Sequence, residues 1–344
     1  MTQQTRKTET AIMRDQIQVL TIAEGFYQSS VLFALVKLSI FERIGEESKT
    51  LDELAAELDA RPDTLLRLLN AGVMLKLLEA EDGSTFRLAP ACRSVLLPSA
   101  GEHYIGNWIR LQDDFCFALS NLDKAILKSG PTIEPSTFLG ADKQRTREYT
   151  WAMHNYASLR GKLLAYYLDT KGCKSLLDIG CGAGTYAFHL GMRNPSLQLY
   201  LLDLPEVLEV AKEVHARYPI ENEVHYLPLD ASRDEIPGSY DLILASNMLH
   251  SFGELERRKL IRRLHDLLTP GGSLVIQSQY LQEDRLGGRW PIYVDLNLLC
   301  TTKSGKNHTV EETRSWLEEA GFVKIEYCSM SVYDANSFLR GHKG

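Results

Sequence analysis

A glycine-rich loop follows an apolar run in the middle of the chain, and it has the clearest chemical meaning of any pattern in the sequence. The run Leu176–Ile179 leads into Gly180, Gly182 and Gly184, which alternate with other residues. Glycine at these positions lets the backbone approach a ligand closely, as it does after the first strand of a doubly wound sheet. A dinucleotide fingerprint would need its third glycine where this chain has Thr185, so the spacing argues against NAD.

Two acidic side chains stand at the ends of the next predicted strands. Asp203 follows the apolar run 197–202, 19 residues after Gly184, and a carboxylate there can bind the hydroxyl groups of a ribose. Asp230 follows the run 224–229 and suits either a ligand contact at the carboxyl edge of the sheet or a cap of the strand end. The loop and Asp203 therefore predict a site for a ligand that carries a ribose, and the glycine spacing argues against a dinucleotide.

His250 is the candidate for acid–base chemistry. It follows the apolar run Leu242–Leu249, which predicts a strand, and so lies at the carboxyl end of the sheet, where open α/β folds place their site residues. An unperturbed imidazole is largely neutral near pH 7 and can accept a proton from an acceptor group. The alternative is a structural histidine that caps the following helix.

The chain from residue 171 onward alternates apolar runs with amphipathic segments, which is typical of a doubly wound α/β fold. An amphipathic helix covers Glu254–Leu268, with Arg257, Arg258 and Arg262 on its solvent side, and Pro270-Gly271-Gly272 ends it. These patterns predict a mostly parallel, Rossmann-like sheet with helices on both faces and an antiparallel C-terminal pair. The predicted strands are 176–179, 197–202, 224–229, 241–245, 273–276, 323–329 and 337–340, and a last helix spans 311–320.

The first hundred residues carry a different, helix-rich pattern. Apolar residues recur at helical spacing over 17–44, and a hairpin turning at Asp82-Gly83 follows two short helices at 51–58 and 62–69. This order predicts a winged helix. Its second helix is mostly apolar instead of basic, which favours a packing or dimerisation module over a reader of DNA. The apolar surface of 17–44 predicts that a partner chain covers it.

The patterns predict three parts of the chain. They are an α-rich winged-helix dimerisation domain over 1–100, connecting helices over 101–170 that contribute to the substrate cleft, and a catalytic domain over 171–344. The connecting part carries polar and aromatic side chains that suit a cleft, namely Trp108, Arg110, Trp151, Met153, His154, Tyr156 and Arg160.

Composition limits the class of partner. The 344-residue chain has a formal net charge of −7, and such an acidic balance opposes a broad nucleic-acid contact. The predicted substrate is therefore a small molecule. The sequence shows no signal peptide and no run of 18 uncharged apolar residues, which predicts a cytoplasmic protein without membrane contact. The six scattered cysteines are typical of reduced thiols, and Cys181 in the glycine loop is expected to serve packing.

The order of these parts resembles one family over nearly the whole chain. It comprises class I S-adenosylmethionine (SAM)-dependent methyltransferases of the plant caffeic-acid and bacterial antibiotic-tailoring type, which join a winged-helix dimerisation domain to a Rossmann-like catalytic domain. The motifs that carry the resemblance are Leu176–Gly184, Leu202–Pro205, Leu249-His250, Leu268–Gly272 and Gly305–Thr309. The resemblance implies SAM as methyl donor, a secondary metabolite as acceptor, and a homodimer formed through the N-terminal domain.

The resemblance also implies donor-binding roles for particular residues. The glycine loop and Asp178 would hold the methionine part, and Asp203 and Leu204 would bind the ribose and one face of the adenine. The other implied donor contacts are Asp230 and Ala231 at the adenine edge, Ser246 on the fourth strand, and Arg160 as a carboxylate clamp.

The acceptor side departs from the family pattern. Relatives of the O-methyltransferase type usually carry His-Asp-Trp where this chain has His250-Ser251-Phe252. The two carboxylates that orient the histidine in those relatives align with Ser278 and Asn307, and His308 stands beside the latter. Neutral donors and acceptors therefore replace the acids.

Several reactions remain open on this sequence. In the first, His250 deprotonates a phenolic or enolic hydroxyl, His308 and Asn307 position the acceptor as further catalytic residues, and a methyl ether forms. In the second, His250 and His308 hold a divalent metal that acidifies the C3 proton of an α-keto acid, and the enolate carbon takes the methyl group. N-methylation and a non-catalytic methyltransferase-like scaffold are the remaining alternatives.

Overall fold

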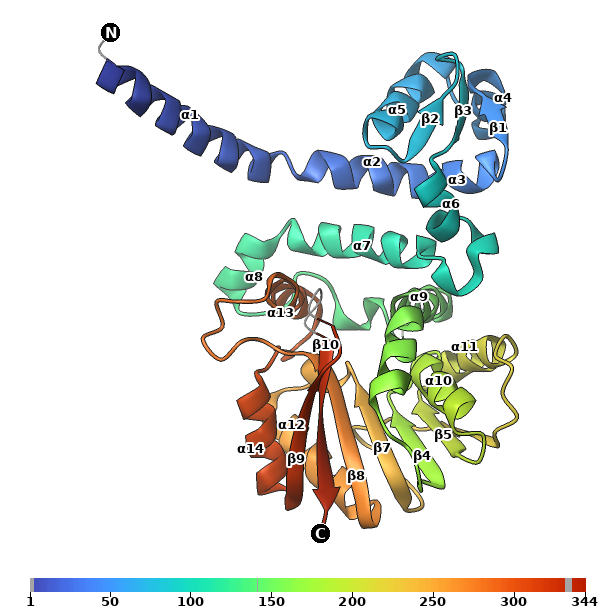
Figure 1. Ribbon diagram of the computed structural model, residues 1–344, viewed down its shortest axis with the longest axis vertical. Helices are drawn as coiled ribbons and strands as arrows, with labels where there is room; N and C mark the ends of the chain where they lie inside the picture. The colour runs from blue at the N-terminus through green and yellow to red at the C-terminus, as the bar shows by residue number, and fades with distance from the viewer. Residues whose placement is uncertain (1–2, 141, 332–335) are drawn as a thin grey trace. The chain divides into compact units, whose positions relative to one another are not determined.

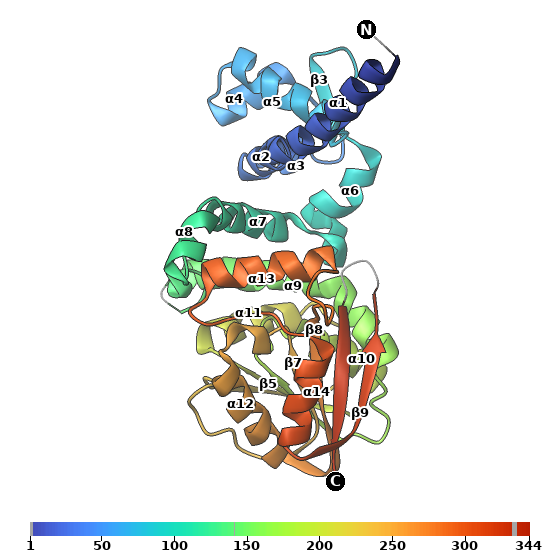
Figure 2. The ribbon, with the colours of Figure 1, turned by 90° about the vertical axis from the view of Figure 1, so that its left-hand side faces the viewer.

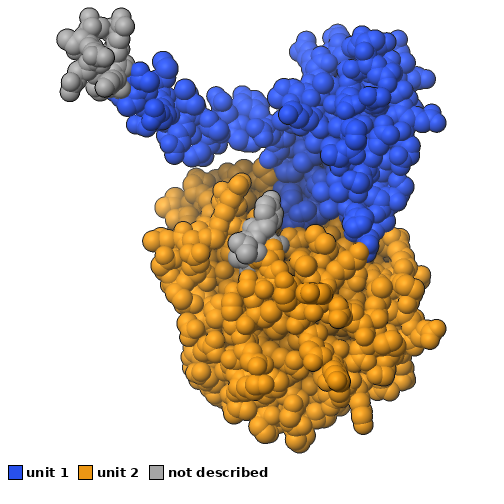
Figure 3. Space-filling model, viewed as in Figure 1, with its two compact units in different colours: residues 1–113 blue, residues 114–344 orange. Residues whose placement is uncertain are grey.

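The structure is a computed structural model that describes residues 3–140, 142–331 and 336–344. Its internal contacts divide the chain into two compact units, residues 1–113 and residues 114–344, drawn in blue and orange in Figure 3. Each unit has a hydrophobic core of its own. The boundary falls inside the segment assigned above to connecting helices, so the three-part division of the chain stays a prediction.

The first unit combines helices with a three-stranded antiparallel sheet. Its elements are α1 (Gln3–Ala23), α2 (Phe26–Lys37), α3 (Ile40–Ile44), β1 (Ser48–Thr50), α4 (Leu51–Leu58), α5 (Pro62–Met74), β2 (Leu78–Ala80), β3 (Thr85–Leu88), α6 (Pro90–Leu96) and the 3₁₀ helix η1 (Pro98–His103). β2 and β3 form the predicted hairpin, in which the Asp82 carboxylate accepts hydrogen bonds from the amides of Ser84 and Thr85. Strand β1, which sequence reasoning missed, pairs with β3.

Local sequence fixes the starts of two helices in this unit. Thr50 and Glu53 form a capping box at the start of α4, and Pro62 occupies the first turn of α5, where an amide proton has no partner anyway. Leu69 and Phe86 bring α5 and the hairpin into one buried core. The predicted order of two helices and a hairpin is confirmed.

The second unit is built on a seven-stranded sheet with the order β6-β5-β4-β7-β8-β10-β9 (Figure 1). Its strands are β4 (Ser175–Ile179), β5 (Gln198–Asp203), β6 (Val224–Pro228), β7 (Tyr240–Ser246), β8 (Leu268–Gln279), β9 (Phe322–Ser329) and β10 (Asn336–Lys343). The first five run parallel, and β10 pairs antiparallel with both β8 and β9. The predicted sheet, with its antiparallel C-terminal pair, is confirmed.

Helices cover both faces of this sheet (Figure 1, Figure 2). They are α9 (Lys143–Tyr167), α10 (Thr185–Arg193), α11 (Pro205–His215), α12 (Glu254–Asp266) and α14 (Val310–Glu319). The other helices of the unit are α8 (Leu122–Lys128) and α13 (Arg289–Thr301), which share a small separate core, and the 3₁₀ helices η2 (Pro135–Thr137) and η3 (Leu249–Ser251). Helix α7 (Gly106–Leu119) contains the boundary between the units. Successive strand residues point to opposite faces, so Leu176 packs in the core of α9, α10 and α11, and Leu177 in the core of α12 and α14.

Three details differ from the sequence-based expectations. The run Leu242–Leu249 is not one strand, because β7 ends at Ser246 and Asn247 adopts a left-handed conformation with φ 50°. Pro270-Gly271-Gly272 lies within β8 instead of between helix and strand, and the register shift opposite Tyr240 and Leu242 absorbs it. Helix α13 was not predicted, since its apolar residues lack a clear helical period.

Candidate functional site

The glycine loop joins the carboxyl end of β4 to the amino end of α10. Gly180, Gly182 and Gly184 all have positive φ, with values of 65°, 54° and 73°. A Cβ atom on Gly184 would lie 2.8 Å from the Phe188 ring, whereas one on Gly182 would meet no described atom within 4 Å. Gly184 is therefore required for packing of the loop on α10, and Gly182 leaves its surroundings open to a ligand.

Cys181 lies beneath this loop, as predicted. Its side chain is buried, and burial raises the pKa of its thiol well above the ordinary value, so the thiol is protonated and unreactive at neutral pH.

Asp203 at the end of β5 is in contact with the loop. One carboxylate oxygen accepts a hydrogen bond of 2.8 Å from the amide of Gly182, and the other accepts one of 2.8 Å from the amide of Leu204. Burial raises the pKa of Asp203 to about 6, with these hydrogen bonds acting in the opposite direction. Asp203, the residue predicted to bind a ribose, is thus hydrogen-bonded to the predicted glycine loop.

Asp178 at the end of β4 is buried, and neither of its carboxyl oxygens has a hydrogen-bond partner among the described residues. Burial, assisted by the charge of Asp203, raises the pKa of Asp178 to about 8. An unpartnered buried carboxyl group beside an open glycine loop fits a ligand that carries positive charge, as the sulfonium and ammonium groups of SAM do.

We expect Asp178→Asn to flatten the pH dependence of stability in the ligand-free protein. The pKa of Asp178 is raised above that of an unfolded chain, so the carboxyl group favours folding below about pH 4 and loses this contribution as the pH rises through about 8. Melting temperatures of wild type and variant between pH 4 and 8 measure the difference. Parallel curves would show that Asp178 ionises normally.

The remaining predicted donor contacts lie on three different elements. Asp230 forms a local cap: its carboxylate accepts hydrogen bonds from Ser232 and Arg233, which outweigh the effect of burial and lower its pKa. Ala231 is buried, and its carbonyl accepts a hydrogen bond from Arg263. In the ligand-free chain Asp230 therefore caps the segment that follows its strand, which is one of the two roles expected from the sequence. Its contact with the adenine edge stays a prediction.

Ser246 at the end of β7 belongs to a buried network of neutral side chains. Its hydroxyl donates to the amide oxygen of Gln277 on β8, and the amide nitrogen of Gln277 donates to Asn336 on β10. Asn247 bonds to the same amide through its side chain at 3.5 Å. These amides tie together the carboxyl ends of β7 and β8 without any charge.

Arg160 lies on α9, with its guanidinium carbon 3.6 Å from the centre of the Tyr156 ring. It donates a hydrogen bond of 2.8 Å to the Tyr156 carbonyl, and the Tyr156 hydroxyl in turn bonds to the side chain of Gln279 on β8. This packing fixes the cation on the helix; its clamp role toward a carboxylate stays a prediction.

His250 lies in η3, the short turn that follows β7. Its side chain is half-buried. Burial, assisted by the positive charge of Arg257, lowers the pKa of His250 to about 4. The imidazole is therefore unprotonated at neutral pH and can accept a proton.

The side chain of His308 is buried, with an exposed fraction of 1%. Its Nδ1 is 2.7 Å from the hydroxyl of Thr313, which donates its own proton to the carbonyl of Thr309. Nδ1 must therefore carry a proton and donate, which leaves Nε2 as an unprotonated atom without a partner among the described residues. Burial also lowers the pKa of His308 well below its ordinary value.

Asn307 is equally enclosed and acts as a brace. Its amide group donates both of its hydrogens, to the carbonyls of Gln279 at 2.8 Å and Pro291 at 3.0 Å, and its oxygen accepts from the amide of His308. Both side chains are only 1% exposed in the ligand-free chain, and the expectation that Asn307 and His308 position the acceptor stays a prediction. Asn307 connects β8 to α13, and of the three predicted catalytic residues only His250 reaches the surface.

No group of three or more His, Cys, Asp or Glu side chains is placed to hold a metal ion within the described ranges. The hydrogen bond to Thr313 occupies one of the two ring nitrogens of His308. The described residues thus offer no third His, Cys, Asp or Glu ligand for the metal-assisted alternative.

Sequence reasoning missed Arg257 by placing it on the solvent side of its helix. The side chain is 3% exposed and packs with the buried residues Leu260, Ile261 and Leu264. The spacing of three, four and seven residues from Arg257 to these leucines and isoleucine was the signal that could have found it.

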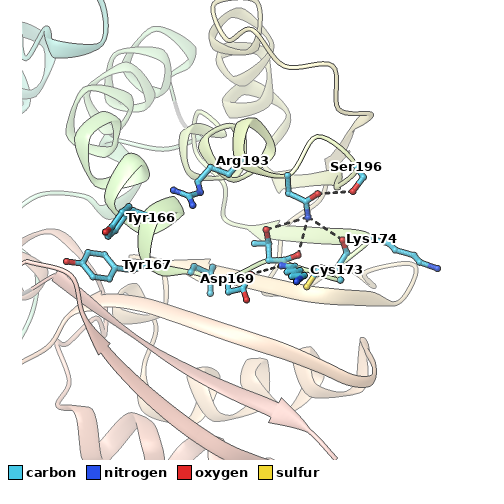
Figure 4. Close-up of a pocket in the computed structure, with 12 residues that line it drawn as sticks. Tyr166, Tyr167, Asp169, Cys173, Lys174, Arg193 and Ser196 are labelled. Carbon is cyan, nitrogen blue, oxygen red and sulfur yellow. Dashed lines mark hydrogen bonds between the residues drawn. The ribbon is translucent and has the colours of Figure 1, made fainter.

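One cavity of the second unit lies away from these residues (Figure 4). It has a volume of about 630 Å³ and is lined by the segment that precedes β4, including Tyr167, Asp169 and Lys174, together with Arg193 at the end of α10. The glycine loop follows the opposite, carboxyl end of β4, so this cavity is not the predicted site.

Comparisons with known proteins agree with the fold. A family model of the O-methyltransferase domain matches residues 113–323, and a model of the O-methyltransferase dimerisation domain matches residues 20–98. The tetracenomycin polyketide synthesis 8-O-methyl transferase TcmO of Streptomyces glaucescens is 30% identical over 320 residues, which cover 92% of this chain and 94% of TcmO.

Two further relatives extend the comparison. The N,N-dimethyltransferase OxyT of Streptomyces rimosus is 26% identical over 88% of this chain and 90% of its own length. The crystal structure of human N-acetylserotonin methyltransferase in complex with SAM superposes with a TM-score of 0.86 at 21% identity, covering 96% of this chain and 98% of that one. The chain therefore belongs to the O-methyltransferase family and is a SAM-dependent methyltransferase.

Proposed function

We propose that this enzyme methylates a phenolic or enolic hydroxyl of a small secondary metabolite, with His250 as the general base. The observation that carries the proposal is the unprotonated imidazole of His250, half-buried on the turn after β7, at the same edge of the sheet as the glycine loop. TcmO, the relative with the highest identity given above, is an O-methyl transferase of a polyketide pathway.

The reaction needs one bond to form, one to break and one proton to move. Bound SAM supplies a methyl group on a positively charged sulfur, which is a good leaving group. The acceptor oxygen forms a bond to the methyl carbon as the carbon–sulfur bond breaks, and an unprotonated nitrogen of His250 takes the hydroxyl proton. The products are a methyl ether, S-adenosylhomocysteine and a protonated His250, which returns its proton to water.

The donor side has residues suited to each part of SAM. The open space at Gly182 admits the ligand, the unpartnered carboxyl of Asp178 suits a cationic group, and Asp203 is placed to exchange a loop amide for ribose hydroxyls. Leu204, Asp230, Ala231, Ser246 and Arg160 complete the proposed donor site. Asn307 and His308 are proposed to act beside His250 in positioning the acceptor, and Asn307 braces the loop that carries both residues.

The type of bond formed is tested with SAM whose methyl group carries deuterium. We expect transfer to oxygen when the enzyme is incubated with a panel of phenols, enols, amines and α-keto acids, as read by mass spectrometry of the products. OxyT shows that a relative can methylate nitrogen, so transfer to an amine alone would overturn the hydroxyl assignment.

We propose that two copies associate through the first unit. Helix α1 exposes large apolar side chains, among them Ile12, Ile17, Leu20 and Ile22, the last of which is 76% exposed. The stretch Thr10–Lys37 is long and apolar enough to cross a membrane by composition, only 11% of its most apolar 18-residue window is buried, and a second copy would cover this surface. The free cysteines suit the cytoplasm, the proposed location.

Replacing Ile17 and Leu20 by Asp is expected to convert a dimer into a monomer. In the dimer the new carboxylates would be buried in the interface without a counter-charge, which is costly. Association would also lose the apolar contacts of Ile17 and Leu20. Sedimentation velocity at micromolar concentration measures the change. The variants Lys162→Asp and Lys212→Asp, at exposed sites of the second unit, serve as the control. A wild-type protein that sediments as a monomer would contradict the proposal.

A further inference from the structure

Arg257 holds a buried positive charge next to the proposed base. Its side chain lies on α12 and is 3% exposed, and none of the ion pairs formed by the described residues includes it. Its neighbour Arg258, by contrast, pairs with Glu254 and Glu319 near the surface. A buried charge without a counter-charge is costly unless polar groups surround it, so the contacts of Arg257 indicate its purpose.

Three main-chain carbonyl groups surround the guanidinium. Nε donates to the carbonyl of Leu249 at 3.0 Å, and Nη2 donates to the carbonyls of Phe252 at 2.9 Å and Lys306 at 2.8 Å. Leu249 is the first residue of the turn that carries His250, Phe252 directly follows that turn, and Lys306 directly precedes Asn307 and His308. One side chain thus fastens two segments that are more than fifty residues apart in the sequence.

Two further contacts fix the same junction. The amide of Lys306 donates a hydrogen bond of 2.9 Å to the carbonyl of His250 itself. On α14, the ring centre of Trp316 lies 4.7 Å from the guanidinium carbon of Arg257, within the range of a cation–π interaction. The cation is therefore held from the turn, the loop and a helix at once.

We propose that Arg257 is a positioning residue for methyl transfer, which locks the turn of His250 to the loop of Asn307 and His308 and so holds the His250 imidazole toward the acceptor. The inference rests on the proposed function, in which His250 is the base. A displacement of about 1 Å at a reacting group can lower turnover by about a hundredfold. The guanidinium of Arg257, which binds three carbonyl groups around His250, is therefore expected to have a large effect on turnover.

The fixed charge of Arg257 also acts on the histidines. After burial, it is the charge that lowers the pKa of His250, and it acts on His308 in the same direction. The other charged or titratable groups near this junction are Glu254 on α12, Asp295 on α13, Glu312 on α14, and His308 and Arg285 in the flanking loops. Removing the cation leaves the acids of this group in excess, so the pKa of His250 should rise.

The test compares Arg257→Met and Arg257→Lys with Arg262→Met as the matched control. Arg262 lies on the same helix and is exposed. We expect kcat to fall by about a hundredfold in Arg257→Met and by about tenfold in Arg257→Lys, whose single ammonium cannot span the three carbonyls. The Kd for SAM should stay within threefold in both variants, and Arg262→Met should behave as wild type.

The pH profile separates positioning from a loss of general stability. The acidic limb of the pH profile of kcat/KM should move to higher pH in Arg257→Met. It should stay at the wild-type pH in Arg257→Lys, which keeps the positive charge. Wild-type kcat in Arg257→Lys, or an equal loss of kcat and SAM affinity in both variants, would overturn the proposal. If Arg257→Met does not fold, as judged by circular dichroism, Arg257→Lys alone decides.

A double variant shows whether Arg257 acts through His250. His250→Ala combined with Arg257→Lys should be no slower than His250→Ala alone, whereas additive losses would mean that Arg257 acts elsewhere. If His250→Ala keeps wild-type kcat, the proposed base is wrong. If His250→Ala is inactive and both Arg257 variants are fully active, only the present inference fails.

Discussion

His250→Ala should lower kcat by about a hundredfold or more and leave the Kd for SAM unchanged. General-base catalysis contributes roughly 10²–10⁴-fold, and the variant leaves the acceptor hydroxyl without a proton acceptor. Donor binding should survive, because the glycine loop, Asp178 and Asp203 lie on β4 and β5 and not on the turn of His250. Single-turnover kinetics and equilibrium binding of SAM measure the two quantities separately.

The pH dependence of the wild-type enzyme gives a second check on His250. Because the base must be unprotonated, kcat/KM should fall as the pH drops through about 4, the value to which burial and Arg257 lower the pKa of His250, and stay level through neutral pH until the acceptor ionises. The limb at about pH 4 should disappear in His250→Ala. The exposed His103 provides the control substitution, and a kcat within threefold of wild type in His250→Ala would remove the base role.

Gly182→Val should abolish SAM binding while leaving the protein folded. Gly182 has φ 54°, and no described atom lies within 4 Å of the place that a Cβ atom would take, so the valine side chain would occupy the space left for the ligand. The strain of a β-branched residue at positive φ costs about 1–2 kcal/mol, which a domain of this size tolerates. We expect at least a hundredfold loss in SAM affinity, measured by calorimetry.

Gly83→Val is the matched control for this experiment. Gly83 lies in the hairpin turn of the first unit, with φ 79° and nothing within 4 Å of an added Cβ, so it carries the same strain far along the chain from the loop. Both variants should melt a few degrees below wild type, but only Gly83→Val should retain the rise in melting temperature on adding SAM. Equal responses to SAM in both would show that the ligand does not approach Gly182.

The sequence identified the donor side more completely than the acceptor side, and the reason lies in how each is built. The donor site depends on short local patterns, since Gly180–Gly184 and the acid at Asp203 each follow an apolar strand directly. Parallel strands bring their carboxyl ends to one edge, so order along the chain was enough to assign the loop and Asp203 to one site. In the structure the amide of Gly182 donates a hydrogen bond to the carboxylate of Asp203.

The acceptor side depends on contacts between distant segments, which pattern alone does not encode. Asn307 stands where the family resemblance places a carboxylate, with His308 beside it, but only the packing of β8, α13 and α14 around them encloses both side chains. Asp230 likewise forms a cap because Ser232 and Arg233 fold back onto it. A side chain's type and place in the sequence do not say which of its atoms are already occupied.

The amino-acid sequence by itself determined the strands of the seven-stranded sheet, the glycine loop and the position of a histidine after the fourth strand, because each follows from local hydrophobic periodicity and backbone preference. It did not determine β1 or α13, whose apolar patterns are too short or too irregular. Only the tertiary structure decided that Arg257 turns inward to the carbonyls of Leu249, Phe252 and Lys306. A charged residue on an amphipathic helix is normally solvated, and burial becomes favourable only where distant segments fold together to supply its hydrogen-bond partners.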